Sequence, residues 1–255
     1  LYSFDITYNP ANILVPGDGY WLMFQEEGTA TIVGTLINEL TIKLDAGWNF
    51  ISGIADTVSI YSVIDLDSII TPGTLYGFDI TYNPASMLVP GEGYWLMFQE
   101  AGTATIVGTP INELTINLNA GWNFISGIAE TVSIYSVIDP DSIIIPGTLY
   151  GFDDAYVESE MFFPGKGYWL KTFEAGEITL ISGALGKTAP RDFSLKGKAN
   201  TLTINGLELF FGLDLSAREK ISYSLPPKPP PGAFDVRFKG DTRIATDKAE
   251  IEVMN

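Results

Sequence analysis

The chain repeats itself with a period of 74 residues. "LYSFDITYNP" begins at position 1, "LYGFDITYNP" at position 75 and "LYGFDDAYVE" at position 149. Residues 1–74 and 75–148 differ at only 11 positions, whereas the third copy, 149–183, has diverged much further. A period of this length is too long for a solenoid unit and is close to the size of a small domain. The sequence therefore predicts a tandem array of small modules.

Each unit is rich in the β-branched and aromatic residues that favour strands. "LTIKLDAGWNFISGI" at 40–54 is interrupted by an Ala-Gly pair, which predicts two strands or one bulged strand. "YWLMF" at 94–98 is apolar on both alternating faces, as in a strand that is buried on both sides. "AGTATIVG" at 101–108 is predicted to be its hairpin partner. We therefore predict an all-β fold of small sandwich or barrel modules.

Two module registers fit the repeat. A module could occupy residues 1–74, or it could run from 36 to 109, beginning with the "LTI…GWN" strand and ending with "GTATIVG". We favour the second register, with a diverging module at 110–183 and the back half of a truncated module at 1–35. Residues 1–35 would then need strands from upstream sequence or from another chain, because unpaired strand edges attract partners.

The composition changes after residue 183. Residues 1–183 contain 3 basic and 22 acidic residues, whereas residues 184–255 contain 11 basic and 9 acidic residues. We predict a distinct C-terminal β module in 184–255, with a hairpin that turns at Asn205-Gly206. "LPPKPPPG" at 225–232 predicts a polyproline II segment that lies outside any sheet.

Composition and charge exclude several classes of function. The net charge of −17 leaves no basic stripe for nucleic acid and disfavours an anionic membrane surface. No apolar run approaches the ~20 residues that cross a bilayer. Cysteine and histidine are absent, which removes disulfides, thiolate zinc sites, a cysteine nucleophile and a histidine general base. We therefore expect no catalytic residues and no enzyme activity. The chain begins at Leu1, and we expect a mature product or part of something longer.

The aromatic residues are the main ligand candidates. The tryptophans lie in GYW and GWN contexts, at Trp21, Trp48, Trp95, Trp122 and Trp169. A tryptophan in a strand that is apolar on both sides is expected to pack in a core. In the alternative interpretation, exposed aromatics bind polysaccharide, and the candidates are then Tyr8, Tyr82 and Trp95.

Acidic pairs recur along the chain, including Glu158 with Glu160. The weak calcium candidates are Asp65, Asp67, Asp139 and Asp141, although the full calcium-loop pattern is missing. A solvated acidic face or a helix cap is the simpler explanation. The glycines of "PGEGYW" are expected to form a tight turn with positive φ rather than a phosphate cradle. We therefore expect no bound cofactor, with calcium as the remaining alternative.

The repeats resemble a known type of module. The order of "AGWNFIS" and "PGEGYWLMF", about 45 residues apart, is similar to the GWN…GYW repeat modules of large secreted or surface proteins of Bacteroidota-like bacteria. "ISYSLPPKPPPGAFDVRF" is similar to a segment that precedes the sorting domain of proteins exported by the type IX secretion system. The resemblance implies an extracellular or cell-surface location and no particular activity.

These observations together predict a structural or adhesive surface protein, such as a spacer, a surface array or a filament or sheath component. Near-identical modules add length or multiply weak contacts without adding new chemistry. The expected partners are copies of the chain or other surface proteins, reached through modules or strand edges, with polysaccharide as the alternative. We expect each module to be self-contained and to unfold by itself, in steps of about 74 residues.

Overall fold

The computed structural model describes residues 2–5, 7–10, 20–21, 39–54, 56–184, 195, 198–246 and 248–254. The chain forms two compact units, Leu1–Leu36 and Ile37–Asn255. Each unit is described by itself.

The N-terminal unit contains one small antiparallel sheet with strand order β2-β1-β3. Its strands are β1 (Tyr2–Asp5), β2 (Thr7–Pro10) and β3 (Tyr20–Trp21). Tyr2 pairs with Trp21 and Phe4 pairs with Tyr8. The residues 74 positions later pair in the same way in the larger unit, so one sequence adopts one strand register in both places.

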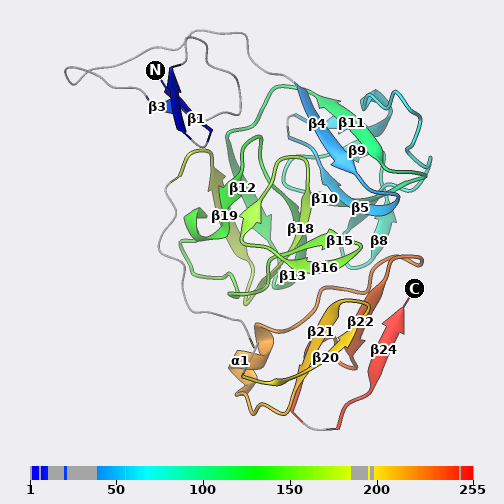
Figure 1. Cartoon of the computed structure of the whole chain (residues 1–255), viewed down its shortest axis with the longest axis vertical. Helices are drawn as coiled ribbons and strands as arrows, with labels where there is room; N and C mark the ends of the chain where they lie inside the picture. Colours follow the sequence, from blue (N-terminus) through cyan, green and yellow to red (C-terminus); the bar gives the residue numbers. More distant parts are fainter. Residues whose placement is uncertain are drawn as a thin grey trace, which may run out of the picture. The chain divides into compact units, whose positions relative to one another are not determined.

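The larger unit begins with a repeat module that occupies residues 39–107 (Figure 1). Its antiparallel sheets have the strand orders β5-β10-β7-β8, β11-β4 and β6-β9. The strands are β4 (Glu39–Leu44), β5 (Gly47–Ser52), β6 (Val58–Ser59), β7 (Tyr76–Phe78), β8 (Tyr82–Pro84), β9 (Met87–Leu88), β10 (Gly93–Phe98) and β11 (Gly102–Val107). A 3-10 turn, η1 (Ile60–Ser62), follows β6.

A second repeat module, residues 113–181, has the same topology. Its sheets are β13-β18-β15-β16, β12-β19 and β14-β17. The elements are β12 (Glu113–Leu118), β13 (Gly121–Ser126), β14 (Val132–Ser133), η2 (Ile134–Ser136), β15 (Tyr150–Asp153), β16 (Ala155–Glu158), β17 (Met161–Phe162), β18 (Gly167–Thr172) and β19 (Gly176–Ile181). The prediction of an all-β fold built from tandem modules is confirmed.

The predicted hairpin within each module is wrong. β10 and β11 follow each other closely along the chain, but β10 pairs with β5 and β7, whereas β11 pairs with β4. The turn after β10 therefore carries the chain from one sheet to another. Short-range turn signals cannot distinguish this connection from a hairpin, because only the more distant partner strands decide it.

Each repeat module has its own hydrophobic core. In the first module Tyr94, Leu96 and Phe98 on one face of β10 pack against Leu44 and Ile106. The second module repeats this arrangement around β18. The opposite faces of these two strands are also buried, as the sequence predicts, but they face away from these cores.

The C-terminal module contains two sheets, β20-β21-β23 and β22-β24. Its elements are β20 (Asn200–Ile204), β21 (Leu207–Phe211), α1 (Ala217–Ile221), β22 (Asp235–Phe238), β23 (Ile244–Ala245) and β24 (Ile251–Met254). The predicted hairpin is confirmed, because β20 and β21 pair across Asn205 and Gly206, whose φ angles of 47° and 85° suit a type I′ turn. The Pro-rich segment lies outside the sheets, as expected.

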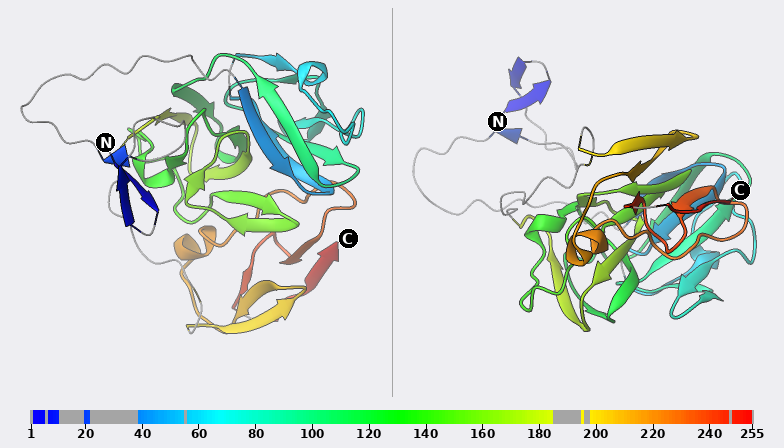
Figure 2. Two further views of the ribbon diagram at one scale, coloured as in Figure 1. Left: turned by 45° about the horizontal axis from the view of Figure 1, so that its top comes forward. Right: turned by 90° about the horizontal axis from the view of Figure 1, so that it is seen from below.

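α1 is the only α-helix among the described residues, and a capping box of Ser216 and Glu219 starts it. None of the helices in this part of the chain has the length and apolar character needed to cross a membrane. In Figures 1 and 2 the yellow-to-red strands of the C-terminal module lie beside the green and cyan strands of the repeat modules.

Candidate functional site

Aromatic side chains of both repeat modules gather in one cluster, which we call the aromatic seam. Its ring-bearing members occupy matching positions, 74 residues apart, in the two modules. They are Trp48, Phe50, Tyr76, Phe78, Tyr82 and Trp95, and their counterparts Trp122, Phe124, Tyr150, Phe152, Tyr156 and Trp169. The core face of β10 uses the even-numbered residues Tyr94 to Phe98, so the alternation of the strand directs Trp95 toward the seam.

Two of the ring contacts across the seam are reciprocal. The ring centroid of Trp95 lies 4.6 Å from that of Phe152, and the ring centroid of Trp169 lies 4.7 Å from that of Phe78. Both pairs meet edge to face, at interplanar angles of 70° and 79°. Between the pairs, the rings of Phe50 and its counterpart in β13 are 4.8 Å apart. The two modules thus use matching residues of one fold to contact each other, although other ring contacts, such as that of Phe50 with Tyr156, have no equivalent on the other side.

The glycine turns before β10 and β18 complete the same interface. The backbone N–H of Ser126 donates to the carbonyl oxygen of Gly91 at 3.2 Å, and the Gly91 N–H donates to the Ser126 hydroxyl at 3.0 Å. In the reciprocal position, the N–H of Ser52 donates to the carbonyl oxygen of Gly165 at 2.9 Å. Gly91 and Gly165 have φ angles of 91° and 72°, as expected for tight turns.

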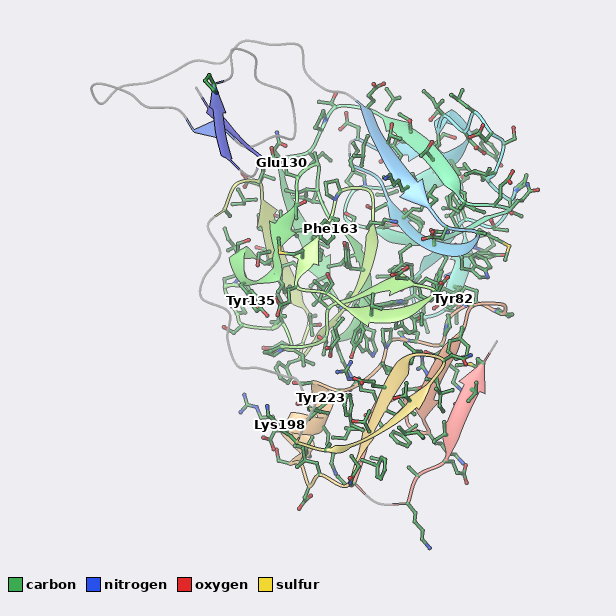
Figure 3. The ribbon with its side chains drawn as sticks, in the orientation of Figure 1. Tyr82, Glu130, Tyr135, Phe163, Lys198 and Tyr223 are labelled. Carbon is green, nitrogen blue, oxygen red and sulfur yellow. The ribbon has the colours of Figure 1, made fainter. Side chains whose placement is uncertain are left out.

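The Pro-rich strap, residues 225–232, lies across the aromatic seam. Trp48, Tyr82 and Tyr156 donate hydrogen bonds to three of its backbone carbonyl oxygens, with donor–acceptor distances of 3.1, 2.9 and 2.6 Å. Figure 3 shows Tyr82 at the edge of the first module, beside the orange trace of this segment. Because an extended proline-rich chain forms no ladder of its own, its carbonyls are free to accept these bonds. The strap therefore joins both repeat modules to the C-terminal module.

A buried ion pair anchors the strap. The Arg237 side chain is fully buried, and its Nε donates to the carboxylate of Asp235 at 2.6 Å. One Nη donates to the carbonyl oxygen of Pro226 in the strap and to the Asp241 carboxylate, each at 2.8 Å. The guanidinium thus fixes the start of the strap to β22.

Two of the three candidate polysaccharide-binding residues, Tyr82 and Trp95, are covered by other parts of the chain. Trp95 is 0% exposed inside the seam. Tyr82 is half-buried beneath the strap, and burial raises the pKa of its phenol to about 12. The backbone of Tyr8 is in β2, but its side chain lies outside the described part of the chain. The side chain of Trp21 lies outside it as well.

The first aspartate of each calcium-candidate pair holds its own loop together. Both carboxylate oxygens of Asp65 accept hydrogen bonds from backbone N–H groups of its own loop, at 3.0 and 2.9 Å, and Asp139 repeats the arrangement at 2.9 and 3.0 Å. Asp67 and Asp141 are exposed. In the part of the chain that the structure describes, no three Asp, Glu, His or Cys side chains are grouped closely enough to hold a metal ion.

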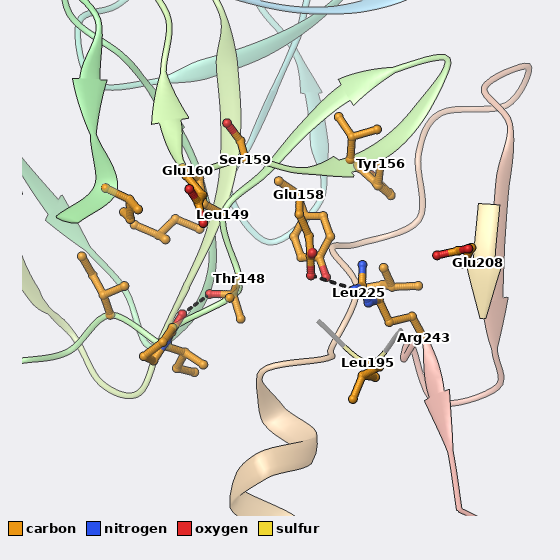
Figure 4. A pocket seen from close by; sticks show the side chains of 18 of the residues that line it. Thr148, Leu149, Tyr156, Glu158, Ser159, Glu160, Leu195, Glu208, Leu225 and Arg243 are labelled. Carbon is orange, nitrogen blue, oxygen red and sulfur yellow. Dashed lines mark hydrogen bonds and ion pairs between the residues drawn. The ribbon is translucent and has the colours of Figure 1, made fainter. Parts of the chain in front are cut away.

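A cleft lies between the second repeat module and the C-terminal module (Figure 4). It is lined by β16 and the loop before β15 on one side and by β21, β22 and Arg243 on the other. Glu158 and Arg243 form an ion pair at 3.1 Å within it. The sequence singles out Glu158 as one of an acidic pair, but it carries no signal for Arg243, which the fold brings there from 85 residues away.

No family model matches the chain, and no curated protein and no solved structure is significantly similar to it. The resemblance to GWN…GYW modules and to a type IX sorting segment therefore stays an expectation.

Proposed function

We propose that this protein is a non-enzymatic, extracellular structural or adhesive component in which repeat modules interlock in pairs to form a rigid body. The reciprocal aromatic seam is the observation that supports this proposal. A repeated unit devoted to chemistry would keep its aromatic and polar residues around an open site, whereas here the matching positions of two copies cover each other.

The strap supports the same proposal. It hydrogen-bonds to both modules and is anchored by Arg237, so the three modules form one body rather than a flexible string. Such rigidity suits a spacer, a surface array or a sheath. The acidic surface, with 22 acidic and 3 basic residues in 1–183, favours solubility of the repeats over nonspecific stacking.

The experiment compares source cells that carry the gene with cells from which it is deleted. Immunogold labelling with an antibody to the chain should mark the outer surface of intact cells. Deletion should weaken attachment or alter the surface layer in electron micrographs. Label confined to lysed cells, or normal attachment together with accumulation of an unprocessed metabolite, would contradict the proposal.

A further inference from the structure

The C-terminal module leaves part of its hydrophobic core uncovered. Among its described residues, the exposed large apolar side chains are Leu202, Phe211, Ile251 and Val253. Leu202 lies opposite the buried Leu209 in its ladder, and Val253 lies opposite the buried Val236. Residues opposite each other share a face of the sheet, and strand alternation places the other two exposed residues on these same faces. All of the exposed side chains therefore belong to the core around Leu209 and Val236.

The outer edge of β20 is open. β20 is the end strand of the sheet β20-β21-β23, and the described residues provide no strand beyond it. The backbone N–H of Phe210 in β21 donates to the carbonyl oxygen of Arg243, on the side away from β20. Thr201, which lies opposite Phe210, therefore forms no ladder bond with β21. By alternation, the backbone groups of Thr201 and Thr203 both point outward from the sheet.

β20 also lacks the features that protect an edge strand. Such strands commonly carry a charge or a proline that discourages pairing. Pro84 lies in the edge strand β8, and Glu158 lies in the edge strand β16. β20 has the sequence NTLTI, with neither a charge nor a proline, and all but its last residue are exposed. It is therefore an edge to which another strand can be added.

The sequence of β20 is complementary to itself. In an antiparallel pair centred on Leu202, Thr201 of one copy lies opposite Thr203 of the other, and the leucines of both copies meet on the axis. This register pairs the outward-pointing backbone groups of both threonines. The chain uses the same threonine pairing in its own ladders, because the hydroxyl oxygens of Thr41 and Thr105 lie 2.8 Å apart and the second repeat module repeats this contact.

The distribution of charge favours contact between copies through this module. Residues 1–183 carry 22 acidic and 3 basic residues, so the repeat modules of two copies repel each other. Residues 184–255 carry 9 acidic and 11 basic residues, which nearly balance. Pairing through the C-terminal modules brings the nearly neutral parts of two copies together and leaves the acidic parts apart.

We propose that β20 pairs with β20 of a second copy of the chain, antiparallel and two-fold symmetric about Leu202. The pairing joins two β20-β21-β23 sheets into one and covers the exposed leucine of each copy. It goes beyond the proposed structural role and does not depend on the location of the protein or on the absence of enzyme activity.

Sedimentation velocity of the whole chain tests this pairing. A dimer should accumulate as the concentration rises toward about 1 mM, as expected for a small interface. A chain that stays monomeric over this range would overturn the proposal. Assemblies that grow beyond the dimer would overturn it as well, because a two-fold contact closes on itself.

Matched variants assign the contact to β20. Leu202→Lys brings two ammonium groups together on the axis, and Thr203→Pro removes an outward N–H that β21 does not use, so circular dichroism should show a preserved fold. Each should weaken dimerisation about tenfold or more. Val253→Lys, at a 56% exposed position of β24 that faces the same core, should leave dimerisation unchanged. Intact dimers in both β20 variants, or an equal loss in Val253→Lys, would overturn the assignment.

A single cysteine provides a measurement that relies on a gain rather than a loss. The chain has no cysteine, so Leu202→Cys introduces its only thiol. Under mild oxidation the facing thiols should form a disulfide-linked dimer about tenfold faster than those of Val253→Cys at equal concentration. Equal rates for the two variants would show that residue 202 does not lie on a two-fold axis and would overturn the proposal.

Discussion

At Gly93 the backbones of the two repeat modules come so close that no side chain fits. A Cβ atom at this position would lie 2.7 Å from the carbonyl oxygen of Ile125 and 2.7 Å from a ring carbon of Phe124. Gly167, its counterpart, is restricted in a similar way by the backbone carbonyl oxygen of Ile51 at 3.0 Å. These are distances to backbone and to a packed ring, which cannot move aside as the end of a flexible side chain can.

Gly93→Ala should therefore destabilise the larger unit by about 3 kcal/mol, the upper range for overpacking. The matched control is Gly53→Ala, because a Cβ there would meet Leu88 at an ordinary 3.5 Å. Urea unfolding of both variants measures the difference. If the two substitutions cost the same, the close approach of the modules does not exist in solution.

Tyr82 makes stability depend on pH in the alkaline range. Burial raises the pKa of its phenol from 10.0 to about 12 in the folded protein, so the folded state holds this proton more tightly than the unfolded chain does. Its contribution to stability is complete below pH 10.0 and is lost as the pH rises toward about 12.

Tyr82→Phe should lose about 1 kcal/mol at neutral pH, because the hydrogen bond to the strap is gone. The difference from the wild type should narrow above pH 10.0, since phenylalanine cannot ionise. Urea titrations at a series of pH values test this, with Tyr61→Phe, at an 87% exposed site, as the control. A constant difference across the alkaline range would show that the Tyr82 phenol is not shielded.

Among the elements, the strap is anchored at its start by a buried guanidinium. Arg237→Met leaves the carboxylate of Asp235 buried without its partner and should cost about 3–5 kcal/mol. Lys239→Met breaks an ion pair whose side chains are 65% and 76% exposed, and should cost less than about 1 kcal/mol. Urea unfolding distinguishes the two. Similar losses would mean that the strap is not held by the Arg237 pair.

The edge-to-face contacts between β10 and β15, and between β7 and β18, should be energetically coupled. In a double-mutant cycle, Phe78→Leu and Trp169→Phe should show an interaction energy of about 0.5–1.5 kcal/mol. The same cycle with Phe78→Leu and Phe162→Leu is the control, because Phe162 belongs to the core of the second module. Unfolding free energies in urea give both values. An interaction energy of zero in the first cycle would show that the two modules do not stabilise each other through these rings.

An element can be predicted from the sequence when the residues that determine it are close together along the chain, and not when its partner strands are far away in the sequence. The turn at Asn205-Gly206 is decided by two adjacent residues, and the predicted hairpin is present. The turn after β10 looks similar locally, yet its strands belong to different sheets because β4 and β5 pair with them. The sequence could not show that Tyr150 and Arg243 line the same cleft, because they lie far apart along the chain.

For the whole molecule, the repeat period predicts the modules but not their pairing. Alternating apolar faces in "YWLMF" show that both faces of the strand must be covered, and the structure covers them. The sequence of a single module does not say whether the second apolar face of this strand is buried by the module's own strands or by another copy. In the structure the other copy buries it, so the modules are not self-contained, and we no longer expect them to unfold one at a time.

Residues 39–254 should instead unfold as one cooperative body. The seam joins the two repeat modules, and the strap joins both to the C-terminal module. Tryptophan fluorescence and hydrogen exchange in β12 and β20 should therefore report one urea midpoint.

Phe238→Ala, in the core of the C-terminal module, should lower the free energy of unfolding by about 3–5 kcal/mol. If the body is coupled, this loss lowers the urea midpoint reported by the fluorescence and by the exchange in both strands, although the substitution lies in neither repeat module. If only the exchange in β20 changes, the modules are independent, and single-molecule pulling should then show the steps of about 74 residues that a string of separate domains produces.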